Sequence, residues 1–544
     1  MLNLVSYLMN KERTITADML GESQEFAVDA ALLSELGEKL IGRPAIALGE
    51  LVKNSFDADG STCRIEFRED EIIISDDGTG MSGNDFLQYW MRLGTTHKVD
   101  QGVSRIFNRP LTGSKGIGRL SAQFLAYEMT LQSTPAGGTE EFLERTSIEA
   151  AESLYAIVDW RNAVAGADLS KVHVAWDMLP DVIAYPNSSP SGTRITLRYL
   201  KKQWDADAIR ALGDDVWMLR SPFRRPPKGG KTATPDDKAP SARRPEDFDI
   251  EIEAPNIAGA QEAFDRRSQM VFSNWKARIQ GRLDQGRSGG TAVVSVDFRP
   301  SYPPGSEGAR RFRENVRIPI ERPGEDRSKE KALVDKVSFE ILIFKPEGRQ
   351  PGGVSVGDLR DYLSKFGNVS VYDAGFRLPY YGSGRNAAGQ DWLSIAADQG
   401  RRLSVSYLLP EHLRTQNKYM EDLPAPGRIF GAVEINTNHE REVADTVDSP
   451  PDEWLQIQSG RDRLMDNPAF YQLRDLVRFS LDFYANRFRL VDLEVAEKNQ
   501  AQEPPSRKYE RAIGALERRK DEIPTSVFRE VKREFTEARR ASMA

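Results

Sequence analysis

The sequence predicts an α/β protein with two successive α/β domains followed by a helical C-terminal region. Three observations support this prediction. Strand-like and helical runs alternate over residues 25–219 and again over 248–485. Residues 220–247 between them are rich in Pro, Gly and charge, which cannot bury a core and predict a linker or exposed loop. Residues 486–544 are heavily charged and helical in pattern, and residues 1–24 form a separate N-terminal segment.

The first domain begins with helical spacing of leucines from residue 28, which Gly42 and Pro44 interrupt before a second helix over 43–58. Two short strands follow at 63–67 and 71–75. Residues 77–118 are rich in Gly, Ser, Thr and Asn, and only 86–93 within them look helical. So long an irregular stretch in a compact domain is usually a functional lid. A helix near 119–127 and strands near 127–133, 154–160, 171–177 and 193–199 complete this domain.

The second domain is predicted from six strand-like runs and from a helix over residues 356–367, VGDLRDYLSKFG. The C-terminal region is predicted to form helices in KYERAIGALERRKDEI and VFREVKREFTEARRAS. The six runs are FDIEIEA (248–254), TAVVSVDF (291–298), VSFEILIF (337–344), NVSVYDAGF (368–376), RLSVSYLL (402–409) and RIFGAVEI (428–435).

Composition excludes several classes of protein. The 544 residues contain no apolar run of about eighteen residues, so no membrane span is expected. The N-terminus lacks the pattern of a secretory signal. Cys63 is the only cysteine, which excludes internal disulfides and cysteine-rich zinc sites and fits a cytoplasmic location. The net charge of −7 argues against a globally basic nucleic-acid binder, although a local basic patch remains open.

The first chemical motif is GELVKNSFDAD, residues 49–59. Glu50, Asn54 and Asp57 are spaced i, i+4 and i+7, which places them on one face of a helix. An Asn side-chain oxygen can coordinate Mg²⁺, and a carboxylate one turn away can deprotonate an attacking water. The alternative interpretation is a solvated polar face on an amphipathic helix.

The second motif is ISDDGTGM, residues 74–81, directly after a strand. Asp76 would stand at the strand's end, where its carboxylate can accept a hydrogen bond from an exocyclic amine such as that of adenine. The following glycines suit a turn or a close approach of backbone to a ligand. Alone, the motif is also compatible with an ordinary acidic turn.

The third motif is TGSKGIGRLSA, residues 112–122, before a predicted helix. Gly113, Gly116 and Gly118 allow consecutive backbone N–H groups to face an anion, and Lys115 adds positive charge. The pattern is neither a Walker A loop nor a dinucleotide fingerprint. A fourth element, GTRITL at 192–197, is the start of a strand and carries little information alone.

In this order and within about 150 residues, the four motifs resemble those of the GHKL ATPase superfamily. That superfamily contains gyrase, the heat-shock chaperone of the ninety-kilodalton class, histidine kinases and MutL. The resemblance is strong over residues 25–200 and looser to about 485. It implies a Bergerat-type ATPase sandwich, a mixed sheet with helices on one face, over 25–219 and a transducer-like α/β domain over 248–485.

The resemblance also implies a role for each motif residue, with ATP and Mg²⁺ as cofactors. Glu50 would be the general base, Asn54 the Mg²⁺ ligand and Asp57 a support of the pocket floor. Asp76 would bind the adenine amine. The remaining nucleotide-binding positions would contact the base or form a lid over the phosphates: Gly80, Met81 and Thr193 at the base, and Lys98, Gly113, Ser114, Lys115, Gly116, Ile117 and Gly118 in the lid.

The resemblance implies one further residue role, in the segment LQIQSGRDRLMDNPAF, residues 455–470. It resembles the place in the chaperone's second domain where an arginine reaches the γ-phosphate. Arg461 is the matching position and Arg463 a second possibility. An arginine there would stabilise charge that develops during phosphoryl transfer. The alternative is a solvated arginine before a helix.

The resemblance leaves the client of the ATPase open. A histidine kinase is disfavoured, because no phosphoacceptor histidine precedes the ATPase domain. A gyrase-type topoisomerase is disfavoured by the chain's length, and the D-Q-H-A signature of the MutL endonuclease is missing. Two hypotheses remain: a chaperone-like ATPase with a protein client, and a MORC- or MutL-like clamp around DNA. Residues 369–395 look like an element of bacterial ATP-binding relatives of both groups.

Charge bears on this choice. Residues 220–244 carry eight basic side chains within an acidic chain, and such a segment can contact the phosphates of DNA or be an ordinary solvated loop. Under either hypothesis the resemblance implies an ATP-dependent homodimer. The eight are Arg220, Arg224, Arg225, Lys228, Lys231, Lys238, Arg243 and Arg244.

Overall fold

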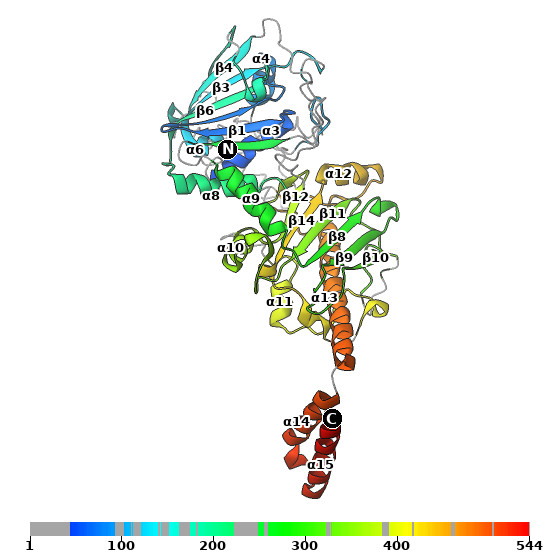
Figure 1. The fold of residues 1–544 in the computed structure, drawn as a ribbon. Helices are drawn as coiled ribbons and strands as arrows, with labels where there is room; N and C mark the ends of the chain where they lie inside the picture. The colour runs from blue at the N-terminus through cyan, green and yellow to red at the C-terminus, as the bar shows by residue number, and fades with distance from the viewer. Residues whose placement is uncertain are drawn as a thin grey trace, which may run out of the picture. The chain divides into compact units, whose positions relative to one another are not determined.

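The computed structural model describes residues 44–92, 103–109, 111, 121–139, 142, 152–162, 174–180, 183–221, 223, 248–254, 259–322, 327, 329–382, 391–415, 418–458, 463–502 and 505–542. The chain divides into two compact units (Figure 1). The first contains residues 1–216 and 234–258, and the second contains residues 217–233 and 259–544. The predicted α/β class is confirmed, because each unit is built on a seven-stranded mixed sheet.

The first sheet has the strand order β5-β4-β3-β6-β2-β1-β7. All neighbouring pairs are antiparallel except β1 and β7, which are parallel. The strands are β1 (Thr62–Phe67), β2 (Glu71–Asp76), β3 (Ala126–Thr134), β4 (Ser153–Asp159), β5 (Ala175–Leu179), β6 (Gly192–Leu200) and β7 (Asp249–Glu253). The helices are α3 (Pro44–Asp57), α4 (Gly83–Asp85), η2 (Phe86–Trp90), α6 (Ser121–Leu125), η4 (Trp160–Asn162), η6 (Pro186–Ser188) and α8 (Ala206–Trp217).

The two faces of this sheet differ in polarity because side chains alternate along each strand. On β1, Cys63 and Ile65 are fully buried on the face that carries α3. The opposite face carries charged side chains in pairs across strands. Arg64 lies 2.9 Å from Glu251 and 3.1 Å from Glu253. At β1 and β7 one face is packed and the other is solvated, which explains the alternating pattern of these two strands.

The strand over 248–254 lies elsewhere than the sequence predicts. The sequence places it at the start of the second domain, but β7 pairs in parallel with β1, from Thr62 opposite Asp249 to Glu66 opposite Glu253. Ile250 and Ile252 are buried there and continue the apolar face of β1. The correction has a simple physical reason: the edge of β1 gains a full set of backbone partners from a strand that follows residues 220–247 in sequence.

The second sheet has the strand order β10-β9-β8-β11-β14-β12-β13. Its strands are β8 (Ala277–Leu283), β9 (Ala292–Phe298), β10 (Arg310–Val316), β11 (Val337–Ile343), β12 (Asn368–Asp373), β13 (Phe376–Arg377) and β14 (Ile429–Ile435). Its helices are α9 (Ala260–Phe272), η7 (Gly286–Ser288), η8 (Pro351–Gly353), α10 (Val356–Phe366), α11 (Ile395–Gly400), η9 (Glu411–Leu413), η10 (Tyr419–Asp422), η11 (Pro426–Arg428), α12 (Thr437–Thr446), η12 (Pro451–Glu453) and α13 (Pro468–Gln502).

Helix α13 is the main helix of the second core, and Figure 1 shows it in orange alongside β8. Its buried residues join one large apolar cluster with the strands. A charged group is buried within this core. Arg478 is 1% exposed, and its guanidinium lies 2.7 Å from Asp398 and 2.7 Å from Asp482. The pair with Asp398 therefore connects α13 to α11 inside the second unit.

The run RLSVSYLL does not form a strand, contrary to the sequence prediction. Residues 403–409 have irregular backbone, and Arg402 has a φ of 53°. Ser406 explains the difference. Its hydroxyl donates to Asp482 on α13 and accepts from the backbone N–H groups of Leu408 and Leu409. These bonds take the place of the backbone hydrogen bonds that a strand would make to a neighbouring strand. Both leucines nevertheless remain fully buried.

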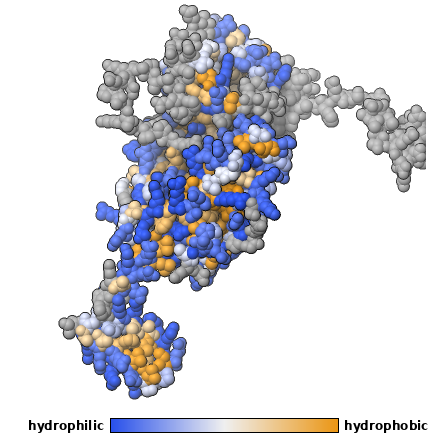
Figure 2. Space-filling model, turned by 90° about the vertical axis from the view of Figure 1, so that its right-hand side faces the viewer, coloured by the Kyte–Doolittle hydropathy of each residue, from blue (hydrophilic) through white to orange (hydrophobic). Residues whose placement is uncertain are grey.

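The C-terminal region is helical, as predicted, but its first helix begins earlier. Helix α13 runs without a break across the expected boundary at 485/486. Helices α14 (Pro505–Arg518) and α15 (Thr525–Ala541), joined by η13 (Lys520–Glu522), pack against each other as a hairpin. Figure 2 shows hydrophobic residues gathered on the face of this hairpin that is in view. None of the helices that the structure describes is long and apolar enough to span a membrane.

Candidate functional site

Helix α3 carries the first predicted motif. The helix forms because Leu48, Leu51, Val52 and Phe56 recur at helical spacing and are buried. Glu50 and Asn54 lie one turn apart on this helix and are half-buried. The two predicted residues therefore share one face of α3.

Two other side chains of α3, those of Asp57 and Lys53, are also largely buried. Asp57, at the end of the helix, is 8% exposed. The Nζ atom of Lys53 lies 2.9 Å from Oε1 of Glu50, and these side chains are only 12% and 14% exposed. The ion pair is therefore largely shielded from solvent.

Asp76 is the last residue of β2 and is 6% exposed. Its Oδ2 accepts a hydrogen bond of 2.9 Å from the Ser55 hydroxyl of α3. Its Oδ1 accepts from the backbone N–H of Gly78 at 3.0 Å and from that of Thr193 at 3.2 Å. The carboxylate is thus fixed by helix α3, by the turn after β2 and by the start of β6.

Burial raises the pKa of Asp76 to about 6, and the neighbouring Asp77 adds to the rise. The hydrogen bonds from Gly78, Ser55 and Thr193 act in the opposite direction. A carboxylate in this situation is poorly solvated when ionised, so a ligand that donates a hydrogen bond to it would restore part of the lost solvation.

Asp77 is also buried but serves the fold. It accepts hydrogen bonds from the backbone N–H groups of Ser61 and Thr62 at 2.7 and 2.8 Å. The side-chain amide of Asn187 donates to it at 3.0 Å. Asp77 therefore joins β1 to η6, and of the two adjacent carboxylates Asp76 remains the candidate for ligand binding.

A close contact with neighbouring backbone requires a glycine at position 80. Its φ is 63°, and a Cβ placed on it would lie 2.1 Å from the carbonyl oxygen of Thr134. The next residue, Met81, donates its N–H to the Ser133 hydroxyl at 2.9 Å. The chain after Asp76 is therefore held directly against the end of β3.

Ser133 and Ser55 are site residues that sequence reasoning missed. Ser133 lies opposite Thr193 in the pairing of β3 with β6, and their hydroxyls are 2.9 Å apart. Thr193 thus contacts Asp76 through its backbone and Ser133 through its side chain. Ser55 stands inside the first motif, one residue after Asn54. Helical spacing places it on the buried face of α3, and this position is the signal that could have identified it.

A second missed group holds the segment 103–109 against the end of α3. Asp59, with a φ of 61°, accepts from the Ser104 hydroxyl and from the backbone N–H of Ile106 at 2.8 Å. The guanidinium of Arg109 donates to the carbonyls of Phe56 at 3.1 Å and Gly60 at 2.7 Å. The chain that leads toward the glycine-rich motif is therefore anchored at the helix that carries Glu50 and Asn54.

Several predicted site residues lie outside the described residues. These are Lys98, the glycine-rich motif from Gly113 to Gly118, with Ser114, Lys115, Gly116 and Ile117, and Arg461. Arg463, the second possibility, is described. Its Nε donates to Gln458 at 2.8 Å, and its guanidinium lies 4.7 Å from the ring centre of Tyr380.

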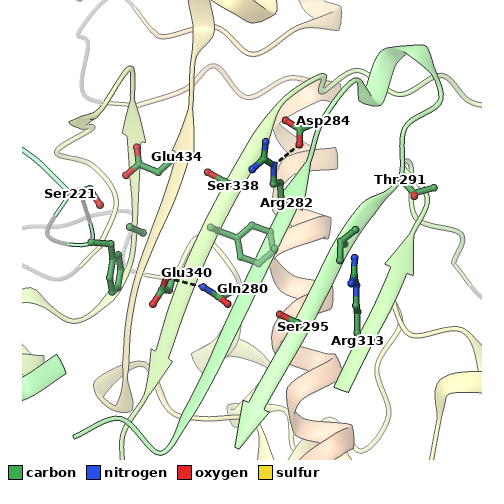
Figure 3. A pocket seen from close by; sticks show the side chains of 15 residues that line it. Ser221, Gln280, Arg282, Asp284, Thr291, Ser295, Arg313, Ser338, Glu340 and Glu434 are labelled. Atoms are coloured by element: carbon green, nitrogen blue, oxygen red, sulfur yellow. Dashed lines mark hydrogen bonds and ion pairs between the residues drawn. The ribbon is translucent and has the colours of Figure 1, made fainter. Parts of the chain in front are cut away.

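The described residues contain no group of three or more His, Cys, Asp or Glu side chains arranged to hold a metal ion. A separate cavity of about 560 Å³ opens on the second sheet (Figure 3). Two polar pairs lie within its wall: Gln280 donates to Glu340 at 3.2 Å, and Arg282 pairs with Asp284. This cavity contains none of the predicted motifs.

Comparison with known proteins concerns the part of the first unit that carries α3 and β2. Residues 43–163 match the family model described as histidine kinase-, DNA gyrase B-, and HSP90-like ATPase. A protein of Herpetosiphon aurantiacus, named "Putative type II restriction enzyme HgiDII", is 34% identical over 103 residues. That match covers 19% of this chain and 17% of the relative's length. The first unit therefore contains an ATPase domain of the histidine kinase, gyrase B and HSP90-like superfamily, the GHKL superfamily.

Proposed function

We propose that this chain binds ATP with Mg²⁺ and hydrolyses it to ADP and phosphate at the site formed by α3, the end of β2 and the start of β6. The buried carboxylate of Asp76 carries the proposal. It is held from three directions and has a raised pKa. A group of this kind suits recognition of a neutral donor such as the exocyclic amine of adenine.

The surroundings of Asp76 suit a planar base. Gly80 and Met81 follow it in a turn that Ser133 holds against β3. Thr193 stands beside them with its hydroxyl on Ser133. In the proposed complex the base lies against Gly80 and Met81, and the Thr193–Ser133 pair orders a water beside Asp76.

Helix α3 provides the groups for hydrolysis. Mg²⁺ keeps several waters and binds few protein ligands when substrate phosphates are present, so a lone Asn54 oxygen is a sufficient donor from the chain. The bound ion would neutralise phosphate charge. Glu50, one turn away, takes a proton from the attacking water as general base. Asp57 supports the floor, while Lys98 and residues 113–118 contribute phosphate contacts.

ATPase activity and nucleotide binding of a Glu50→Gln variant test this proposal. Loss of the base should lower the turnover number by about 100-fold or more and leave ATP affinity nearly unchanged. Glu69→Gln is a matched control, because Glu69 is an exposed glutamate of the same unit. Wild-type turnover in Glu50→Gln, or an absence of ATP binding in the wild type, would refute the assignment.

The larger proposed role is a nucleotide-gated homodimer in which Arg461 of the second unit senses the γ-phosphate. Such a contact exists only with ATP bound, so it favours the closed state over the open one. Sedimentation of Glu50→Gln with and without ATP tests the dimer, and an unchanged mass would contradict it. Arg461→Ala should lower turnover and spare binding.

A DNA client is the favoured partner, and a protein client the alternative. Eight basic side chains lie within residues 220–244 of an acidic chain, and the relative from Herpetosiphon aurantiacus is named as a restriction enzyme. Each phosphate contact steepens the fall of affinity with salt. Gel shifts at two salt concentrations should show salt-sensitive binding that is lost when these residues are neutralised. No binding would favour the protein client, and binding without that loss would show that residues 220–244 are not the DNA contact.

A further inference from the structure

The ion pair between Lys53 and Glu50 has no role in the functions proposed above. Both residues belong to α3, three positions apart, with the acid on the N-terminal side. Exposed helices carry many such pairs, and each contributes little to stability because water screens the charges. This pair differs in burial: the side chains are 12% and 14% exposed, and the charged atoms are 2.9 Å apart.

The position of the pair matters because of its neighbours. Lys53 immediately precedes Asn54, and Ser55, which follows, bonds to Asp76. Glu50 and Lys53 therefore stand on the segment of α3 that carries every proposed catalytic and metal-binding group of the described site.

A general base works only when its carboxylate is ionised and points at the reacting water. A glutamate has three rotatable side-chain bonds, so an unsupported carboxylate occupies several rotamers. An ammonium group in a shielded ion pair restricts this freedom and favours the ionised form of its partner. Catalytic bases in many enzymes are oriented by a third group in this way.

We propose that Lys53 is a positioning residue that holds the carboxylate of Glu50 in the orientation for accepting a proton from water. The inference rests on the proposed function, since it requires Glu50 to be the general base. The proton from the water passes to Glu50, the resulting hydroxide oxygen bonds to the γ-phosphorus, and the bond from that phosphorus to the bridging oxygen of ADP breaks.

A double-mutant cycle tests this inference on the full-length protein. Lys53→Met keeps an unbranched side chain that is only one atom shorter and removes its charge. It should lower the turnover number about tenfold or more, as loss of an orienting partner does at other sites, and leave the dissociation constant for ATP unchanged. Lys53→Arg should recover part of the rate, because a guanidinium can pair with the same carboxylate. Lys202→Met, which removes an exposed lysine of the same unit, should behave as wild type.

The decisive measurement is Lys53→Met in the Glu50→Gln background. If Lys53 acts through Glu50, the second substitution should cause no further loss of turnover. Additive losses of turnover, or a weakened affinity for ATP, would overturn the inference and would point to a direct phosphate contact. A turnover equal to wild type in Lys53→Met would also overturn it and would show that Lys53 has no role. Failure of the proposed function is distinguishable, because Glu50→Gln alone would then retain wild-type turnover.

Discussion

Replacing Asp76 with asparagine should stabilise the first unit while it abolishes ATP binding. The pKa of Asp76 is about 6 in the folded chain, compared with about 3.9 for an unfolded aspartate. A difference of about two pKa units corresponds to about 3 kcal/mol, which is the stability that the ionised carboxylate costs at neutral pH. The asparagine side chain would carry no charge to desolvate. We expect a gain in the free energy of unfolding of about 1–3 kcal/mol at neutral pH.

The hydrogen bonds allow this exchange. An amide oxygen in place of Oδ1 keeps the bonds from Gly78 and Thr193. An amide nitrogen in place of Oδ2 requires the Ser55 hydroxyl to accept instead of donate. Ser55 already lies 3.3 Å from the carbonyl of Leu51, to which it can give its proton. ATP binding should nevertheless fail, because the adenine amine would face the N–H₂ group of the new amide, which donates hydrogen bonds and cannot accept one.

The pH dependence follows from the sign of the shift. A folded pKa above the unfolded value means that the folded chain binds the proton more tightly, so wild-type stability falls as pH rises from about 4 to about 6. The advantage of Asp76→Asn should therefore be complete above about pH 6 and absent near pH 4.

Urea unfolding at about pH 7.5 and about pH 4.5 measures the advantage, and the transition that ATP shifts in the wild type identifies the first unit. A less stable variant at the higher pH, or equal gains at both pH values, would refute the reasoning.

Two further substitutions test other parts of the structure. Gly80→Ala should destabilise the first unit by more than about 1 kcal/mol and weaken ATP binding, because the new Cβ meets the carbonyl oxygen of Thr134 at 2.1 Å and φ is 63°. Thermal unfolding would measure the stability, and nucleotide titration would measure the affinity for ATP. Unchanged values of both would contradict the predicted clash. Arg478→Met should lower the free energy of unfolding of the second unit by about 3–5 kcal/mol, because it leaves Asp398 and Asp482 buried without their cation. Urea unfolding measures this free energy. A value within about 1 kcal/mol of wild type would show that the core accommodates those carboxylates in another way.

Local features of the fold were predictable from the sequence. Helix α3 followed from the spacing of its apolar residues, and β1 and β2 followed from two short runs of strand-forming residues separated by a charged turn. The position of Asp76 at the end of β2 followed from the strand that precedes it. These features depend on neighbours within a few residues, and their period is visible in the chain.

Features that depend on distant pairing were not predictable. Ser133 belongs to the site only because β3 lies beside β6, which places it opposite Thr193. β7 joins the first sheet through a parallel pairing with β1, although about 180 residues separate the two strands. The run 402–409 had the composition of a strand, but the bonds of Ser406 to Asp482 and to the following backbone fixed another shape.

The parallel pairing of β7 affects how this protein can be dissected. Between residues 216 and 259 the chain passes from the first unit to the second, back to the first, and again to the second. An N-terminal fragment that stops at residue 219 would lack β7 and leave one edge of β1 without backbone partners, which invites aggregation. A single proteolytic cut inside 224–247 would not release a complete ATPase domain either, because its last strand would remain covalently attached to the other half of the molecule.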